Sequence, residues 1–188
     1  MSDKKLKKQI LKPIKEYHKS FSEKRFKEIK SKDDILMNVF EITEEIKNQN
    51  KQYWGRELGF LWELIVIEVF KNDINYKCKP VWDGQSPCDF FIKDYAIDPK
   101  YRIGSGDSGT LKGWARDGDM LKEKGYKPIM LILREDNLPA AIRRISPHWE
   151  LKIGEEALDF IKEESGFDLK EFLISLKGKY DIKEDILY

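Results

Sequence analysis

Residues 88–100 read CDFFIKDYAIDPK, two short apolar runs that meet at the polar dipeptide Lys93-Asp94. Short apolar runs between polar residues favour β-strands, and a two-residue link joins strands that run antiparallel. The sequence therefore predicts paired strands over 88–93 and 95–100, with Lys93-Asp94 as the turn of a hairpin. The other predicted elements are placed around this hairpin.

The predicted register brings acidic side chains together. Counting outward from the turn puts Asp89 opposite Asp98, and strand alternation puts Lys100 on the same face. Two facing carboxylates repel, and a divalent cation such as Mg²⁺, which prefers oxygen ligands, would neutralise them. Lys100 would then be placed to orient a water or to stabilise negative charge on a phosphate. The alternative interpretation is an exposed Asp98–Lys100 ion pair with no chemical role.

The rest of the chain predicts further helices and strands. The 56–70 segment is apolar nearly all round and is expected to form a deeply buried helix. Strands are expected over 76–79, 128–133 and 149–152, and other helices over 3–31 with an interruption near Pro13, 33–49, 110–124 with Thr110 as its cap, 138–145, 155–164 and 169–176. This order predicts an α/β fold with a central mixed β-sheet flanked by helices, including N-terminal and C-terminal helices.

The acidic residues of the hairpin resemble a known motif. Pro87-Cys88-Asp89, followed after eight residues by Asp98-Pro99-Lys100, resembles the PD-(D/E)XK nuclease superfamily, and within it type II restriction endonucleases. The likeness covers roughly residues 56–135, with a looser likeness over 149–173. It implies Mg²⁺-dependent, site-specific cleavage of double-stranded DNA. It assigns Asp89 and Asp98 as metal ligands, Lys100 as the catalytic lysine, and Glu63 as the acidic residue of the preceding helix.

Two positions depart from the strict pattern. Cys88 separates Pro87 from Asp89, where the strict pattern joins proline to the acid. Pro99 occupies the middle of the triplet, and proline is disfavoured in a central strand because it lacks an N–H group. The pairing of residues 98–100 is therefore the part of the predicted geometry that most needs a structure.

Basic and hydroxyl side chains near the hairpin are candidates for DNA contact. The Gly/Ser loop over 103–110 lacks the lysine that a nucleotide-binding P-loop places before Thr110, so nucleotide hydrolysis is rejected. Its backbone amides are expected to approach a DNA phosphate or groove, with an ordinary loop as the alternative. The DNA-binding candidates are Arg102, Ser105, Ser108, Lys112, Arg116, Arg143 and Arg144, each of which has solvated surface as its default interpretation.

The length of 188 residues fits a single domain, predicted as a helical arm over 1–50, a catalytic core over 56–152 and C-terminal helices over 153–188. The formal net charge is only +1, but residues 1–32 carry twelve basic and four acidic side chains. Such an arm suits contact with phosphates, although a solvated lysine-rich helix is an equal alternative.

The expected assembly is a homodimer, because a twofold-symmetric protein reads a palindromic site. The apolar stripe at 35–46 is the candidate dimer surface. No segment has the length of a membrane span or the pattern of a signal peptide, so a cytoplasmic protein with free thiols at Cys78 and Cys88 is expected. The alternatives are a repair or Holliday-junction-resolving nuclease of the same superfamily, or a DNA-binding protein without catalysis.

Overall fold

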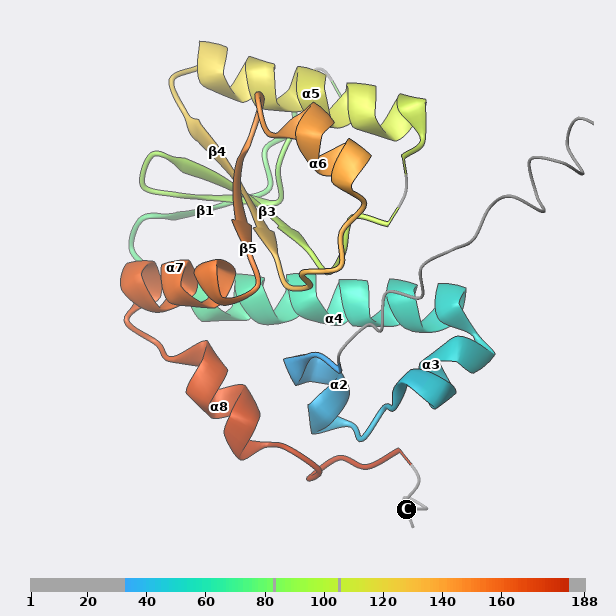
Figure 1. The fold of residues 1–188 in the computed structure, drawn as a ribbon. Helices are drawn as coiled ribbons and strands as arrows, with labels where there is room; N and C mark the ends of the chain where they lie inside the picture. Colours follow the sequence, from blue (N-terminus) through green and yellow to red (C-terminus); the bar gives the residue numbers. More distant parts are fainter. Residues whose placement is uncertain (1–32, 83, 105, 183–188) are drawn as a thin grey trace, which may run out of the picture. The chain divides into compact units, whose positions relative to one another are not determined.

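The computed structural model describes residues 33–82, 84–104 and 106–182, which belong to one compact unit. The fold is α/β, with a five-stranded mixed β-sheet flanked by helices, as the sequence predicts (Figure 1). The helices predicted over 3–31 lie outside the described residues. Residues 33–50 belong to the same compact unit as the residues that follow them.

The sheet contains its strands in chain order: β1 (Tyr76–Cys78), β2 (Phe90–Ile92), β3 (Tyr95–Lys100), β4 (Lys127–Ile132) and β5 (Glu150–Ile153). The first three strands are antiparallel neighbours, whereas β3–β4 and β4–β5 are parallel pairs. Each parallel pair needs a crossover, which α5 (Ser108–Glu123) and α6 (Pro139–Ile145) provide. The hairpin strand β3 therefore becomes the middle strand of the sheet.

The predicted turn of the hairpin is confirmed. Ile92 pairs with Tyr95, which leaves Lys93 and Asp94 as the two-residue link, and Lys93 takes a positive φ of 53°. This dipeptide is a weak turn former by itself. Its side chains are held by neighbouring elements, since Lys93 forms an ion pair with Glu164 at 2.8 Å and Asp94 forms one with Lys127 at 2.8 Å.

Pro99 is accommodated because its missing N–H group falls where no partner strand needs it. The Lys100 carbonyl accepts from the Leu133 amide on the β4 side at 3.0 Å, whereas the Ile97 carbonyl accepts from the Asp89 amide on the β2 side at 3.0 Å. Backbone groups alternate along a strand, so the nitrogen of Pro99 faces the β2 side. The β2 ladder has already ended there, and β3 continues to Lys100 paired only with β4.

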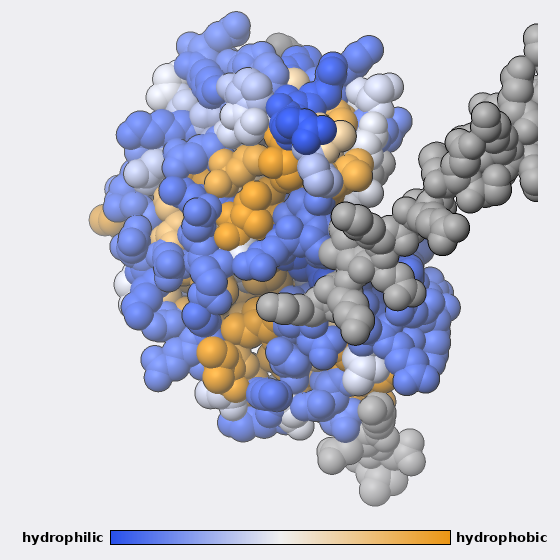
Figure 2. All heavy atoms as spheres, in the orientation of Figure 1, coloured by the Kyte–Doolittle hydropathy of each residue, from blue (hydrophilic) through white to orange (hydrophobic). Residues whose placement is uncertain are grey.

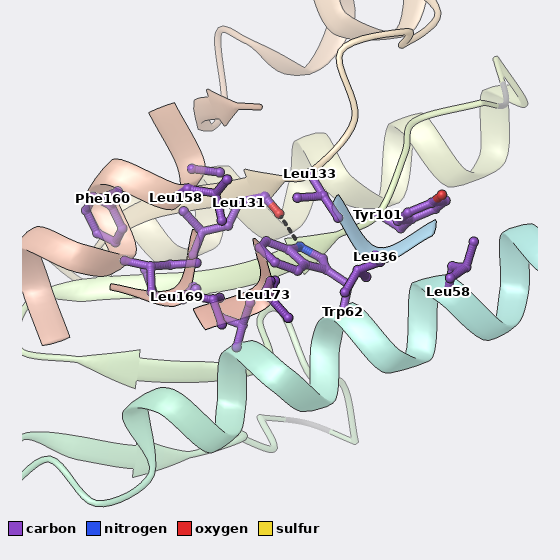
Figure 3. Close-up of a cluster of buried hydrophobic side chains, with 14 of the residues drawn as sticks. Leu36, Leu58, Trp62, Tyr101, Leu131, Leu133, Leu158, Phe160, Leu169 and Leu173 are labelled. Atoms are coloured by element: carbon purple, nitrogen blue, oxygen red, sulfur yellow. Dashed lines mark hydrogen bonds between the residues drawn. The ribbon is translucent and has the colours of Figure 1, made fainter. Parts of the chain in front are cut away.

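One face of the sheet is covered by α4 (Lys51–Phe70) and α7 (Glu155–Ser165) (Figure 1). Trp62 is fully buried there, and its Nε1–H donates to the Leu131 carbonyl at 2.9 Å, which ties the middle of α4 to β4 (Figure 3). Leu58, Val66 and Phe70 continue this buried face of α4. The other face carries α5 and α6, with Phe91, Ala96, Met130 and Ile132 of the sheet beneath them.

Helix α4 differs from its prediction. It begins at Lys51, where Asn50 caps it by accepting from the Tyr53 amide at 3.0 Å. Its outer face is open, since Phe60 and Leu64 are 56 % and 60 % exposed. The apolar residues on all sides suggested deep burial, but the helix lies across one face of the sheet and buries only one side.

The predicted helix over 33–49 is two short helices, α2 (Ile35–Val39) and α3 (Glu44–Gln49). A turn separates them, in which Glu41 takes a positive φ of 52°. Leu36, Met37 and Val39 are buried in the core that α4 covers. The stripe at 35–46 is therefore not the dimer surface that the sequence suggested.

Larger apolar side chains are exposed on α4 and on α8 (Leu169–Ser175), whose Phe172 and Ile174 are 47 % and 56 % exposed. On the face drawn in Figure 2, hydrophilic residues dominate and hydrophobic ones show in separate patches.

Helix α5 begins two residues earlier than predicted. Asp107 caps it, because its carboxylate accepts from the Thr110 amide at 2.9 Å and from the Thr110 hydroxyl at 3.0 Å. Thr110 therefore lies in the first turn. The helix ends before Gly125, which takes a positive φ of 84°, as predicted.

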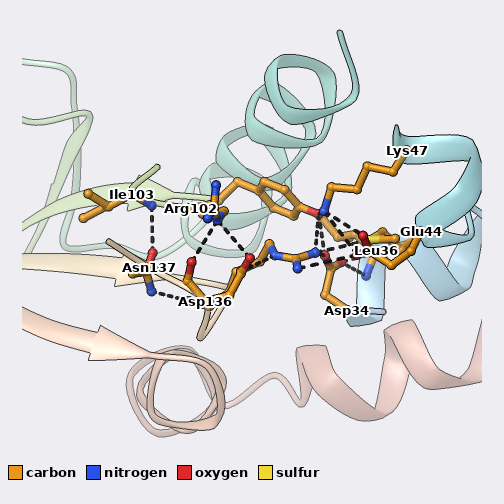
Figure 4. Close-up of polar contacts among 11 residues, drawn as sticks. Asp34, Leu36, Glu44, Lys47, Arg102, Ile103, Asp136 and Asn137 are labelled. Atoms are coloured by element: carbon orange, nitrogen blue, oxygen red, sulfur yellow. Dashed lines mark hydrogen bonds and ion pairs between the residues drawn. The ribbon is translucent and has the colours of Figure 1, made fainter. Parts of the chain in front are cut away.

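A buried polar network ties α2 to the ends of β3 and β4 (Figure 4). Arg134, with 3 % of its surface exposed, forms ion pairs with Asp34 at 2.7 Å and with Asp136 at 2.6 Å. Asp34 also caps α2 by accepting from the Leu36 and Met37 amides, and it accepts from the Tyr101 hydroxyl. One carboxylate thus caps a helix and neutralises a buried guanidinium.

Arg134→Met is expected to lower the free energy of unfolding by about 3–5 kcal/mol, because it leaves a largely buried carboxylate without its cation. Urea denaturation measures this change. The matched control is Arg102→Met, which removes a 40 % exposed partner of Asp136 and is expected to cost less than about 1 kcal/mol. Equal losses in the two variants would contradict the structural role of Arg134.

Candidate active site

Three charged side chains form a row across the first three strands. The β1–β2 register pairs Cys78 with Phe90, so the next position places Lys79 opposite Asp89. Lys79 Nζ donates to Asp89 Oδ1 at 3.1 Å. On the other side of Asp89 lies Asp98 of β3, and the row continues into the middle of the sheet.

Asp89 stands just beyond the last ladder pair with β3. Phe90 is opposite Ile97, and the Asp89 amide donates to the carbonyl of the same Ile97. The chain therefore leaves the ladder at Asp89, and the strict Asp89–Asp98 pair of the prediction is not formed. The two carboxyl groups still lie around one ammonium, because Lys100 Nζ contacts both of them.

Lys100 lies between the two acids. Its Nζ donates to Asp98 Oδ1 and lies 3.9 Å from Asp89 Oδ2. Burial by itself would lower the pKa of Lys100, but the charges of Asp98 and Asp89 outweigh it and raise that pKa. Lys100 is therefore held as an ammonium beside both carboxylates.

Asp98 is buried, with 5 % of its surface exposed. Burial raises the pKa of Asp98, and the nearby Asp89 carboxyl raises it further, whereas Lys100 acts in the opposite direction. In such surroundings, a nearby positive charge stabilises the ionised form of the carboxyl group. The repulsion that the sequence predicted between the two acids is thus present in the fold.

Glu63 of α4 is influenced by the charges of the hairpin. Burial raises the pKa of Glu63, and the charge of Asp89 raises it too, while Lys100 and Lys79 lower it. Glu63 is next to the buried Trp62, so the packing of α4 on the sheet sets its position. The contacts of the site join Asp89 and Asp98 to Lys79 and Lys100, and Glu63 is coupled to them through its charge.

The pair Asp89 and Asp98 is the donor set available to a cation. Among residues 33–82, 84–104 and 106–182, no group of three or more His, Cys, Asp or Glu side chains is arranged to hold a metal ion. Mg²⁺ is commonly held by one or two carboxylates, with water and substrate phosphate as its other ligands. Asp89 and Asp98 therefore supply the number of carboxylates that Mg²⁺ commonly uses.

Lys79 was missed by the sequence analysis. The two predicted strands contained the information needed to find it. An antiparallel pairing of 76–79 with 88–93 can place residue 79 opposite residue 89. The sequence does not assign the register between these two predicted strands, since residues 80–87 separate them. The sequence alone does not fix how such a loop closes.

The predicted DNA-binding residues fall into two groups. Arg102 lies two residues beyond the end of β3, where its Nε lies 3.0 Å from Asp136 Oδ2, and Ser108 is the first residue of α5. Lys112 lies on the first half of α5, and Arg116 forms an ion pair with Asp117 at 3.0 Å. Ser105 lies outside the described residues.

Arg143 and Arg144 lie on the last turn of α6. The residues that follow them contact the second half of α5, where His148 lies 2.7 Å from Asp119. Within the part of the chain that the structure describes, no contact joins the two arginines to the acids of the site. They form a separate basic cluster.

Cys88 lies beneath the site with 3 % of its surface exposed, in the core that α5 and α6 cover. Burial raises the pKa of its thiol, and the charges of Asp98 and Asp89 raise it further. The residue that departs from the strict motif is therefore a neutral, packed thiol next to Asp89.

A thiol reagent applied to the native protein at pH 8 is expected to label one equivalent, at the exposed Cys78, and two equivalents in denaturant. The Cys78→Ser variant should then show no label in the native state. Labelling of Cys88 in that variant at the rate of a free thiol would contradict its burial beneath the acids.

Comparison of the chain with family models, with curated proteins and with solved structures finds no match. Among the helices that the structure describes, none combines the length and apolar character needed to cross a membrane.

Proposed function

We propose that this protein is a Mg²⁺-dependent endonuclease that hydrolyses phosphodiester bonds of double-stranded DNA. The observation that carries the proposal is the meeting of Asp89 and Asp98 with Lys100 between them on the hairpin. Two carboxylates with one ammonium at a partly open site suit a cation, a phosphate and an attacking water. A bound divalent cation would polarise a phosphoryl oxygen and lower the pKa of its water.

The side chains of the site have distinct roles in this proposal. Hydrolysis forms a bond from the water oxygen to phosphorus and breaks the bond to one sugar oxygen, so negative charge grows on the phosphate. Lys100 Nζ is the donor that stabilises this charge. Glu63, with its raised pKa, is a better proton acceptor than an ordinary glutamate and takes the proton that the water loses.

The restriction-type assignment rests on the likeness of Pro87-Cys88-Asp89 and Asp98-Pro99-Lys100 to type II enzymes. Such an enzyme cuts at defined sites, and a homodimer would match the symmetry of a palindromic target. Arg102, Ser108 and Lys112 are the proposed DNA contacts that follow Lys100 most closely in the chain.

Lys100→Ala is expected to lower the rate of plasmid cleavage by about 10²-fold or more, because the donor to the developing charge is lost. DNA binding, measured with Ca²⁺ in place of Mg²⁺, should remain within a few-fold of the wild type. The control is Lys93→Ala, which removes the same charge at the turn of the same hairpin and should cut normally. Wild-type turnover by Lys100→Ala would refute the role of Lys100.

Asp89→Asn is expected to abolish both cleavage and the binding of Mg²⁺ to the metal-free protein, as followed by calorimetric titration. It keeps the shape of the side chain but removes the charge that a cation needs. Asp94→Asn, the same change at the exposed end of the hairpin, should leave both properties unchanged. Mg²⁺-dependent cutting by Asp89→Asn would show that the acids of the hairpin are not the site.

A further inference from the structure

Lys79 is a second lysine at the proposed site, and it differs from Lys100 in its surroundings. The side chain of Lys79 is 54 % exposed, whereas that of Lys100 is 26 % exposed. Lys79 follows β1, the edge strand, so it lies on the open side of the row. Lys100 lies on the middle strand, on the inner side.

The contact that holds Lys79 is one that cation binding would replace. Its Nζ donates to Asp89 Oδ1, and this hydrogen bond is the largest influence that raises its pKa. Asp89 is one of the two carboxylates proposed to bind the cation. An ammonium on Asp89 and a cation on the same carboxylate repel each other. Lys79 is the more exposed of the two lysines, so it is the one with room to turn away when the cation arrives.

The nearest anion available to the displaced ammonium is the substrate itself. A DNA phosphate that reaches the two carboxylates approaches from the exposed side, where Lys79 already stands. Lysine binds phosphate as a compact charge on a flexible stem, so a small rotation is enough to move it from a carboxylate to a neighbouring phosphate.

We propose that Lys79 is a substrate-binding residue that leaves Asp89 when the site is loaded and binds a phosphate of the DNA backbone beside the bond to be cut. This inference rests on the proposed function. It assigns Lys79 to binding and leaves the stabilisation of the developing charge to Lys100. Since a backbone phosphate is present at every step of DNA, the contact strengthens binding to all sequences alike.

The test compares Lys79→Met with Lys77→Met. Lys77 is an exposed lysine two residues earlier, on β1, so its removal makes the same change in net charge next to the same site. Binding to a short DNA duplex is measured with Ca²⁺ at several salt concentrations, and cleavage is measured with Mg²⁺. Circular dichroism checks that both variants are folded.

Lys79→Met is expected to weaken duplex binding about tenfold and to reduce the slope of log affinity against log salt by about one, because one phosphate contact is lost. The KM for cleavage should rise while kcat stays within about twofold. Lys79→Arg should restore most of the affinity, and Lys77→Met should stay near the wild type. Equal effects of the two methionine variants, or an unchanged salt slope in Lys79→Met, would overturn the inference.

The two proposals fail in different ways. If the wild type cuts DNA and Lys79→Met binds duplex as the wild type does, Lys79 is not a phosphate contact but the nuclease proposal stands. If the wild type binds duplex through Lys79 but cuts no DNA with Mg²⁺, the phosphate contact stands and the nuclease proposal fails. If the wild type does not bind duplex at all, both are wrong.

Discussion

The ion pair between Asp98 and Lys100 on the middle strand is the interaction on which the site depends. A carboxylate with 5 % exposure costs stability unless a cation accompanies it, and the lysine two residues later on the same face supplies that cation. A pair of apolar residues would serve a central strand better in terms of stability alone. This cost to stability is the reason that we assign these charges to the proposed chemistry.

The charged cluster around Arg134 differs from the cluster around Asp98 in its exposure to solvent. Its guanidinium is 3 % exposed and has carboxylate partners on two sides, so the cluster joins α2 to the sheet. In the cluster around Asp98, both lysines are more exposed than Arg134: the side chain of Lys100 is 26 % exposed and that of Lys79 is 54 % exposed. The proposed exchange of a lysine for a metal cation relies on this difference in exposure.

Much of the fold follows from local pattern. The hairpin could be predicted because its apolar runs, its two-residue link and its acids all agree on one register. The exposure of the outer face of α4 could not be predicted, because Phe60 and Leu64 are as apolar as the buried Trp62. Only the placement of the helix on the sheet decides which of these side chains is buried. The break between α2 and α3 was hidden for a similar reason, since their apolar residues continue one helical period across the turn.

Some residues of the site could be predicted from the sequence and others could not. Asp89, Asp98 and Lys100 lie within one hairpin, so sequence spacing was enough to bring them together. The position of Lys79 depends on how residues 79–89 return the chain to β2, and the position of Glu63 depends on the packing of a helix. Contacts between residues that are far apart in the sequence depend on the whole fold and not on the neighbouring residues alone.

The central claim is that the hairpin acids and Lys100 cut DNA with the help of a cation. The most direct test is to incubate the purified protein with phage DNA, once with Mg²⁺ and once with a chelator, and to map the ends of any fragments. The account predicts discrete fragments with defined ends in Mg²⁺ and intact DNA in chelator. Intact DNA under both conditions, or equal cutting in both, would contradict it.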